Sequence, residues 1–154
     1  MERFSALKGR ALLFLSFIWL IWFLNFTARA IFSPILPFME DEFAISHATA
    51  SSVFIYTSIG YGGSLFLSGL LGGRIGYKKS IFFSLLLAAI ALGTIQFVGT
   101  FAHVCFLAFI FGFAAGTYLP SILPLITTYY SEKTWSRAIT IHDCAAPISI
   151  FAAP

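Results

Sequence analysis

Long runs of apolar residues, interrupted by short charged stretches, dominate the pattern of this chain. Charged residues gather at 1–10, 40–42, 74–79 and 132–137, and the runs between these stretches are almost free of charge. A helix needs about 20 apolar residues to cross the hydrocarbon core of a bilayer, and each run is at least that long. Because the apolar residues are continuous rather than alternating, the pattern predicts membrane-spanning helices and disfavours a β-barrel.

The run from 80 to 131 is too long for one crossing, because a helix rises about 1.5 Å per residue and the apolar core is about 30 Å thick. Gly99 and Thr100 form the natural loop that divides it. The prediction is an all-α membrane protein, with a basic head at 1–10 and a bundle of about five transmembrane helices in the domain 11–154. The predicted helices are 11–38, 47–72, 80–98, 101–130 and 135–154.

The first apolar run has two interpretations. Pro34 and Pro37 are expected to end or kink a first membrane helix, which leaves 40–42 as an acidic loop. The alternative is a secretory signal peptide with an A-x-A cleavage site at 28–30. The run is long for a signal peptide, it contains two tryptophans, and further spanning segments follow it, so the membrane helix is favoured.

Composition indicates a lipid environment. The chain is 59% hydrophobic and 10% charged, with a mean hydropathy of +0.92, whereas soluble domains carry about 25% charged residues. In a soluble protein, the net charge of +3 would suggest a nucleic-acid partner. Here every Lys and Arg except Arg29 lies in 1–10, 74–79 or 132–137. Membrane orientation explains that distribution, and no nucleic acid is expected.

The same basic residues predict the topology. Cytoplasmic loops of membrane proteins carry an excess of Lys and Arg. The amino terminus and both basic connections are therefore placed in the cytoplasm, and the opposite loops hold no Lys or Arg. The expected location is a cell inner membrane, crossed several times, with the lipid bilayer as a partner.

The sequence holds no arrangement typical of an enzyme site. Cys105 and Cys144 lie inside apolar runs without the CxxC spacing of a metal site. No nucleophile-and-base arrangement or phosphate-binding loop occurs. Enzyme activity, a cofactor and a metal are therefore not expected.

A glycine-rich, basic stretch at 69–79 reads G-L-L-G-G-R-I-G-Y-K-K. It resembles the loop between helices two and three of the major facilitator superfamily, whose pattern is G-x-x-x-D-R-x-G-R-R/K. Gly73 stands where the family usually has Asp, and Tyr77 stands where it usually has Arg. The resemblance implies a cytoplasmic conformational hinge whose charge-based gate is altered by the missing Asp. The hinge residues are Gly69, Gly73, Arg74, Gly76 and Lys78.

Two further stretches agree with this resemblance. Gly112 and Gly116 form a G-x-x-x-G in the fourth predicted helix, and such small residues let helices approach closely in lipid. Ala108 takes the place of an Arg that is common in the family, and W-S-R-A at 135–138 looks like the usual start of helix five. The family folds as two six-helix halves, so the resemblance implies an incomplete amino-terminal transporter domain. The missing remainder of the transporter would be its partner.

Arg29 is the one basic residue inside an apolar run. An Arg at the centre of a bilayer costs about 2.5–3.5 kcal/mol on insertion scales, so it usually faces a cavity. Its planar fork pairs with carboxylate or phosphate, and Asn25 lies one turn earlier on the same face. Organic-anion members of the superfamily often carry an Arg in this helix. The alternative is that Arg29 snorkels to the outer interface.

Hydroxyl-bearing residues recur at helical spacing along the second and fourth predicted helices. One hypothesis is that they line a substrate cavity. The other is that they form hydrogen bonds between helices, worth only about 0.6 kcal/mol each. The candidate substrate-binding residues are Arg29, Asn25, Thr57, Tyr61, Ser64, Thr117 and Ser121.

His142 and Asp143 are adjacent near the start of the fifth predicted helix. A titratable pair in a membrane helix is a candidate for proton coupling, and a proton or sodium ion would drive a symporter. Adjacent helical residues point about 100° apart, so only one of them can face a cavity squarely. The alternative is that both are wet near the cytoplasmic face.

The leading functional hypothesis is therefore a secondary transporter that moves a small solute, an organic anion, by alternating access. The alternative is a truncated membrane fragment with no transport of its own, or an assembly partner.

Overall fold

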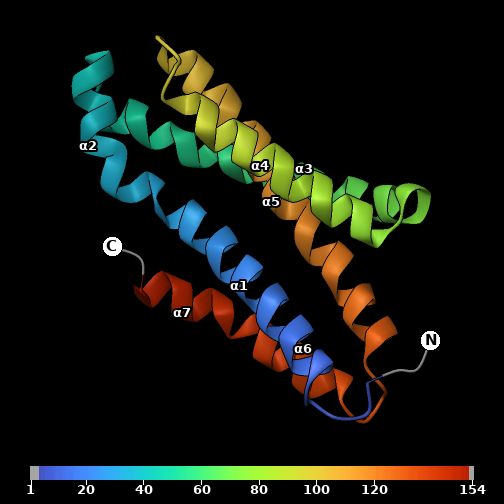
Figure 1. Ribbon diagram of the computed structural model, residues 1–154. Coiled ribbons are helices and arrows are strands. Elements are labelled where there is room, and N and C mark those ends of the chain that lie inside the picture. The colour runs from blue at the N-terminus through green and yellow to red at the C-terminus, as the bar shows by residue number, and fades with distance from the viewer. Residues whose placement is uncertain (1–3, 153–154) are drawn as a thin grey trace. The chain divides into compact units, whose positions relative to one another are not determined.

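Seven α-helices and no β-strand make up the described part of the chain, residues 4–152 of a computed structural model (Figure 1). Arg3 of the predicted head, the last two positions of the fifth predicted helix and the side chains at 70 and 71 lie outside this description. The all-α fold class is confirmed. The helices are α1 (Arg10–Ala30), α2 (Phe32–Phe43), α3 (His47–Ile75), α4 (Tyr77–Ile95), α5 (Phe101–Tyr129), α6 (Trp135–Asp143) and α7 (Ala145–Ala152).

Three helical segments within the described residues are long and apolar enough to cross a membrane. They are Arg10–Phe43, which joins α1 and α2, Tyr77–Ile95 and Phe101–Tyr129. Helix α3 matches α5 in length, at 29 residues, but glycines and hydroxyl-bearing side chains interrupt its apolar residues. That α3 and the α6–α7 pair also cross the membrane stays a prediction.

The first predicted helix is interrupted after Ala30 and then continues further than expected. Pro34 has no N–H to donate to the carbonyl of Ala30, so α1 ends there and α2 follows. The expected acidic loop at 40–42 is helical, because α2 runs on to Phe43. That expectation was wrong: Pro37 lies inside α2 and removes one hydrogen bond without ending the helix.

The predicted hinge at 69–79 is almost entirely helical. Helix α3 continues through the glycines to Ile75 and α4 begins at Tyr77, so Gly76 alone separates them. Gly76 has a φ of 84°, a conformation that glycine adopts without steric cost. Unpaired backbone groups are costly in a membrane, so the chain keeps its helical hydrogen bonds through the other glycines. Gly69, Gly73 and Arg74 lie in the last turns of α3, and Lys78 lies in the first turn of α4.

Pro147 divides the fifth predicted helix in two. Without an N–H it cannot bond to the carbonyl of Asp143, where α6 ends, and α7 begins at Ala145. The other differences are shifts of helix ends, because α4 occupies Tyr77–Ile95 where 80–98 was expected.

The chain divides into two compact units, which we describe separately. The terminal unit is Met1–Pro34 with Leu123–Pro154, and the central unit is Ile35–Ile122. In the terminal unit, α1 packs along α6 and α7 (Figure 1). On α1, and likewise on α6 and α7, the buried residues recur every three or four positions and form a stripe along one helix face. The buried stripe of α1 is Ala11, Leu15, Ile18, Trp22 and Asn25, and that of α6 and α7 is Ala138, His142, Ala145 and Ser149.

The described amino-terminal residues are tied to the connection that follows α5. The N–H of Phe4 donates to the carbonyl of Tyr129 at 2.8 Å, and the N–H of Ser131 donates to the carbonyl of Phe4 at 3.1 Å. The buried hydroxyl of Tyr130 donates to the carbonyl of Ala11. These bonds fix the start of α1 beside the end of α5 within the terminal unit.

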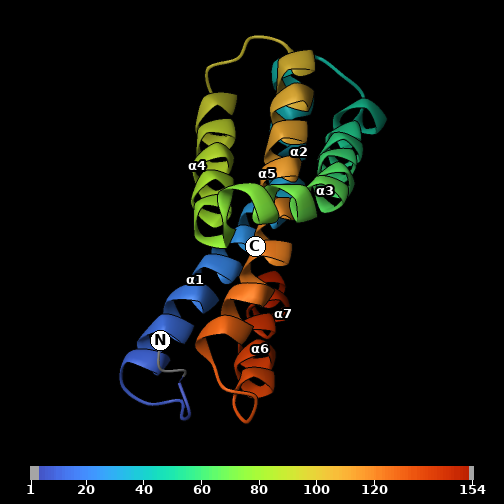
Figure 2. The same cartoon turned by 90° about the vertical axis from the view of Figure 1, so that its right-hand side faces the viewer.

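In the central unit, which holds α3, α4 and most of α5 (Figure 2), α3 and α5 meet at glycines. A Cβ added at Gly112 would collide with the carbonyl oxygen of Thr57, and one at Gly116 would lie 2.8 Å from the carbonyl oxygen of Tyr61. Gly60 of α3 faces the backbone of α5 in the same way. The prediction that G-x-x-x-G permits close helix packing is therefore confirmed.

Candidate functional site

Two aromatic rings stack where α1 meets α6 in the terminal unit. The indole of Trp22 and the imidazole of His142 have centroids 5.6 Å apart and an interplanar angle of 16°. Both side chains are buried. His142 reaches this position because it lies one turn after Ala138 on the buried stripe of α6. The contact thus places a titratable ring inside the helix packing.

Asp143 points in another direction, as adjacent helical residues must. Its side chain is 52% exposed, whereas that of His142 has no exposed surface. The two are joined by a hydrogen bond of 2.9 Å between Nδ1 of His142 and Oδ1 of Asp143. An ionised carboxylate can only accept, so Nδ1–H donates. The pair links a buried imidazole to an exposed acid, a geometry through which a proton can pass.

Asn25 lies one turn beyond Trp22 on the buried stripe of α1. The residue is 7% exposed, and its Oδ1 accepts no hydrogen bond from the described part of the chain. A buried acceptor without a donor costs about 1–3 kcal/mol. The stripe thus carries an acceptor that the terminal unit does not satisfy.

Replacing Asn25 with leucine is expected to stabilise the protein by about 1 kcal/mol, because leucine has a similar volume and no oxygen to leave unpaired. Thermal unfolding of the purified protein in detergent, followed by helix content, measures the change. Thr27→Val is the control, since the Thr27 hydroxyl already donates to the carbonyl of Phe23 at 3.0 Å and its loss should give no gain. A lower unfolding midpoint for Asn25→Leu than for the unaltered protein would contradict this prediction.

Arg29 lies in the last turn of α1, one turn beyond Asn25, where the helix dipole favours a cation. Its guanidinium carbon is 5.1 Å from the centroid of the Phe26 ring. That ring in turn meets Trp22 edge to face, with centroids 4.7 Å apart. Arg29, Phe26 and Trp22 therefore form a continuous row of contacts along α1, which begins at the stacked rings of Trp22 and His142. The Arg29 side chain is half-buried. This exposure is intermediate between that of a residue inside a cavity and that of a residue at the membrane interface, the two interpretations considered from sequence.

Thr57 and Ser64 of α3 lie in the contact with α5 rather than in an open cavity. Both are buried, and they pack against Gly112 and Gly116 respectively. Their hydroxyls donate to carbonyls of their own helix, that of Thr57 to the residue four earlier at 2.9 Å and that of Ser64 to Tyr61 at 2.7 Å. These contacts make the packing of α3 on α5 their first role.

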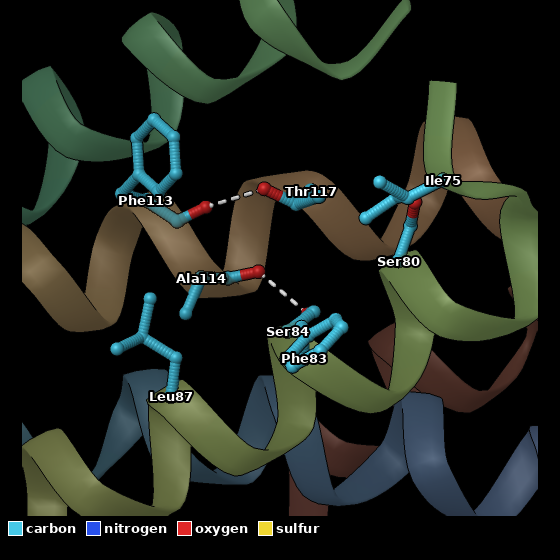
Figure 3. A pocket seen from close by; sticks show the side chains of 8 residues that line it. All are labelled: Ile75, Ser80, Phe83, Ser84, Leu87, Phe113, Ala114 and Thr117. Atoms are coloured by element: carbon cyan, nitrogen blue, oxygen red, sulfur yellow. Dashed lines mark hydrogen bonds between the residues drawn. The ribbon is translucent and has the colours of Figure 1, made fainter. Parts of the chain in front are cut away.

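Thr117 and Ser121 of α5 follow the same pattern. The hydroxyl of Thr117 donates to the carbonyl of Phe113 at 2.9 Å, and that of Ser121 donates to the carbonyl of Thr117 at 2.9 Å. Thr117 also lines a pocket of about 240 Å³ between α5 and α4 (Figure 3). Within the central unit, these four predicted polar residues therefore lie in contacts between helices and donate their hydroxyl hydrogens to carbonyls of their own helix.

The candidate residues fall into two groups, one in each unit. Asn25, Arg29, His142 and Asp143 belong to the terminal unit, and Thr57, Tyr61, Ser64, Thr117 and Ser121 belong to the central unit. Sequence reasoning missed Ser149 of α7, which is fully buried and donates to the carbonyl of Ala146 at 2.8 Å. Its helical spacing from His142 was the available signal. The described residues contain no group of three His, Cys, Asp or Glu side chains that could hold a metal ion.

Comparison with known proteins gives one family and two relatives. Residues 18–154 match the family described as Major Facilitator Superfamily. A hexuronate transporter of Bacillus subtilis (strain 168) is 22% identical over 132 residues, which cover 86% of this chain and 31% of that protein. The putative niacin/nicotinamide transporter NiaP of the same strain is 28% identical over 141 residues, which cover 86% of this chain and 35% of that protein.

The chain thus spans about a third of the length of the curated relatives it matches. No solved structure matches it significantly.

Proposed function

Because the chain belongs to the Major Facilitator Superfamily, we propose that it is part of a secondary transporter that carries a small organic anion by alternating access. Its relatives are transporters rather than enzymes, one of hexuronate and one putatively of niacin or nicotinamide. Hexuronate carries a carboxylate at neutral pH, as does niacin but not nicotinamide, so the anionic substrate is supported chiefly by the hexuronate relative. The protein is a multi-pass membrane protein. The positive-inside rule supports a cytoplasmic amino terminus, and we propose a cell inner membrane as its location.

The observation that carries the anion proposal is that Arg29 and Asn25 lie one helical turn apart on α1. Arg29 offers a planar fork of donors that matches a carboxylate. One turn away, Asn25 offers a buried acceptor that the terminal unit leaves unsatisfied. A substrate with a carboxylate and a hydroxyl or ring N–H would satisfy both groups, because a carboxylate alone cannot donate to Asn25. A hydroxylated carboxylic acid fits these demands.

We further propose that His142 and Asp143 couple transport to a proton gradient. Asp143 is exposed, and its hydrogen bond to His142 leads inward to the ring stacked on Trp22. The stack lies one turn before Asn25 along α1, so a charge change at His142 alters the surroundings of the substrate site. The alternative is coupling to sodium, and uptake measured under a proton gradient or a sodium gradient distinguishes the two.

Within the central unit, we propose that polar side chains of α3 and α5 offer acceptors to a substrate. Donation to helix carbonyls occupies the hydroxyl hydrogens of Thr57, Ser64, Thr117 and Ser121, which leaves their oxygens to act as acceptors. Tyr61 is half-buried and brings a phenolic hydroxyl to the same face of α3. Gly76, with its positive φ between two long helices, is the proposed point of bending.

The test is uptake by cells that express the complete gene. We expect uptake of labelled glucuronate or niacin, competition by unlabelled carboxylates, and at least tenfold weaker competition by nicotinamide, which keeps the ring but lacks the charge. An inward proton gradient should raise the initial rate, whereas a sodium gradient at constant pH should not. Equal competition by nicotinamide and niacin would contradict the anion proposal, and dependence on sodium alone would contradict the proton proposal.

A further inference from the structure

An apolar pocket of about 240 Å³ lies between α4 and α5 in the central unit (Figure 3). Hydrocarbon side chains make up most of its wall, namely those of Ile75, Phe83, Leu87, Phe113 and Ala114. An engineered protein cavity of about 150 Å³ with such a wall stays dry and binds benzene. The pocket is therefore large enough to hold a hydrocarbon ligand.

The three hydroxyl groups in the pocket wall already donate to carbonyl oxygens. Ser84 donates to the carbonyl of Ala114 on α5 at 2.7 Å (Figure 3). Ser80 and Thr117 each donate to the carbonyl of the residue four positions earlier, at 3.2 Å and 2.9 Å respectively. A buried water needs two to four polar partners, and these bonds leave no hydroxyl hydrogen for one. The wall therefore favours an apolar ligand over water or a polar solute.

The opening of the pocket is bordered by apolar side chains. Ile75, Phe83 and Leu87 line the pocket and are nevertheless exposed, so they lie at its rim. Both helices that form the pocket, α4 and α5, are long and apolar enough to cross a membrane. Outside such helices the medium is the hydrocarbon of the bilayer. The ligand that this medium supplies is the acyl chain of a lipid.

The position of the pocket along α4 places it within one leaflet. Its lining on this helix begins at Ser80 and ends at Leu87, which is about 10 Å at a rise of 1.5 Å per residue. One leaflet contributes about 15 Å, half of the apolar core of the bilayer. Because Lys78 and Lys79 lie in the first turn of α4, that end of the helix is at the level of the headgroups. An acyl chain that descends from these headgroups passes the pocket.

We propose that this pocket holds one acyl chain of a membrane lipid, which enters from the leaflet beside the basic connection and packs between α4 and α5. The hydrogen bond from Ser84 to Ala114 joins the two helices, and the chain fills the space that their side chains leave beside this bond. Lipid tails are as apolar as leucine, so the hydrophobic effect does not hold the chain. Dispersion contacts with the pocket wall hold it instead, and they are lost when the pocket is filled by protein.

The experiment uses the full chain in vesicles of phosphatidylethanolamine and phosphatidylglycerol that contain a phosphatidylcholine with a light-activated diazirine in the middle of one acyl chain. Peptide mass spectrometry locates the residues that become labelled. Leu87 and Leu86 are a matched pair, because they are 37% and 43% exposed and only Leu87 of the two lines the pocket. We expect about fivefold more label on Leu87, since dispersion attraction adds up over many atom pairs.

Replacing Ser80 with leucine fills the pocket from the side of α4 and should lower the ratio of label on Leu87 to label on Leu86 from about five to about one. Ser80 is buried, and the carbonyl that loses its hydroxyl keeps a hydrogen bond from the N–H of the same residue. Ser58→Leu is the matched control, because it makes the same change at an exposed position of α3 outside the pocket and should leave the ratio unchanged.

Three results would overturn the proposal. Equal label on the two leucines of the unaltered protein rejects it without any variant. An unchanged ratio in Ser80→Leu would place the bound chain outside the pocket. An equal fall in Ser80→Leu and Ser58→Leu would show a general change in lipid contact in place of a site. Circular dichroism of the vesicles confirms that the variants are helical before their labelling is compared.

Discussion

Replacing Gly112 with valine is expected to destabilise the central unit by about 3 kcal/mol, the upper range for forcing a larger side chain into a packed contact. The first added carbon would collide with the carbonyl oxygen of Thr57 and lie 2.9 Å from its Cα. Both are backbone atoms of α3, so no side-chain rotation relieves the overlap and the two helices must separate. Their separation would also expose the buried hydroxyls that pack against these glycines.

The measurement is the yield of monodisperse protein in detergent together with its thermal unfolding midpoint. Gly63→Val is the matched control, because a Cβ at Gly63 meets nothing within 4 Å while the change in helix propensity is the same. We expect Gly112→Val to lose most of its folded yield and Gly63→Val to keep it. Similar losses in both variants would mean that helix propensity, rather than the α3–α5 contact, limits stability.

The sequence was informative wherever a local pattern had one physical outcome. Unbroken apolar runs had to form helices, because hydrocarbon offers no partner for the backbone. The spacing of Gly112 and Gly116 predicted a close helix contact, and both glycines do face the backbone of α3. The family could be recognised for the same reason, since the basic glycine stretch stands at a fixed place in the order of helices.

Helix ends were less predictable, because proline and glycine have context-dependent effects. Pro37 was expected to end or kink a helix and lies inside one, whereas Pro147 was given no such role and lies just after a break. The glycines before Ile75 suggested a loop and are helical. In each case the cost of one missing hydrogen bond or one flexible residue competes with the cost of unpaired backbone in a membrane.

The candidate site needed tertiary contacts to be resolved. Sequence spacing showed that only one of His142 and Asp143 could face inward, and the stack on Trp22 assigns that place to His142. The unsatisfied oxygen of Asn25 is likewise invisible in sequence, because it depends on what α6 and α7 bring to α1. Sequence spacing left two hypotheses for the polar residues of α3, a cavity wall and hydrogen bonds between helices, and it could not reveal that the hydroxyls of Thr57 and Ser64 donate to carbonyls of their own helix.

Arg29 has the largest expected effect on function. Its guanidinium is held over Phe26 and lies one turn from Asn25, and the proposed carboxylate pairs with it. Removing one partner of a buried, hydrogen-bonded charge pair costs about 2–5 kcal/mol, so Arg29→Gln should reduce carboxylate uptake about 100-fold. Arg29→Lys keeps the charge but loses the planar fork, so its carboxylate uptake should lie between that of the unaltered protein and that of Arg29→Gln.

The most direct test of anion binding at Arg29 is the initial rate of glucuronate or niacin uptake by the unaltered protein, Arg29→Gln and Arg29→Lys at equal expression. We expect a large loss of uptake for Arg29→Gln that appears mainly as a higher substrate concentration for half-maximal uptake, with partial recovery for Arg29→Lys. If Arg29→Gln leaves both the rate and that concentration unchanged, Arg29 is an interfacial residue and does not bind the anion.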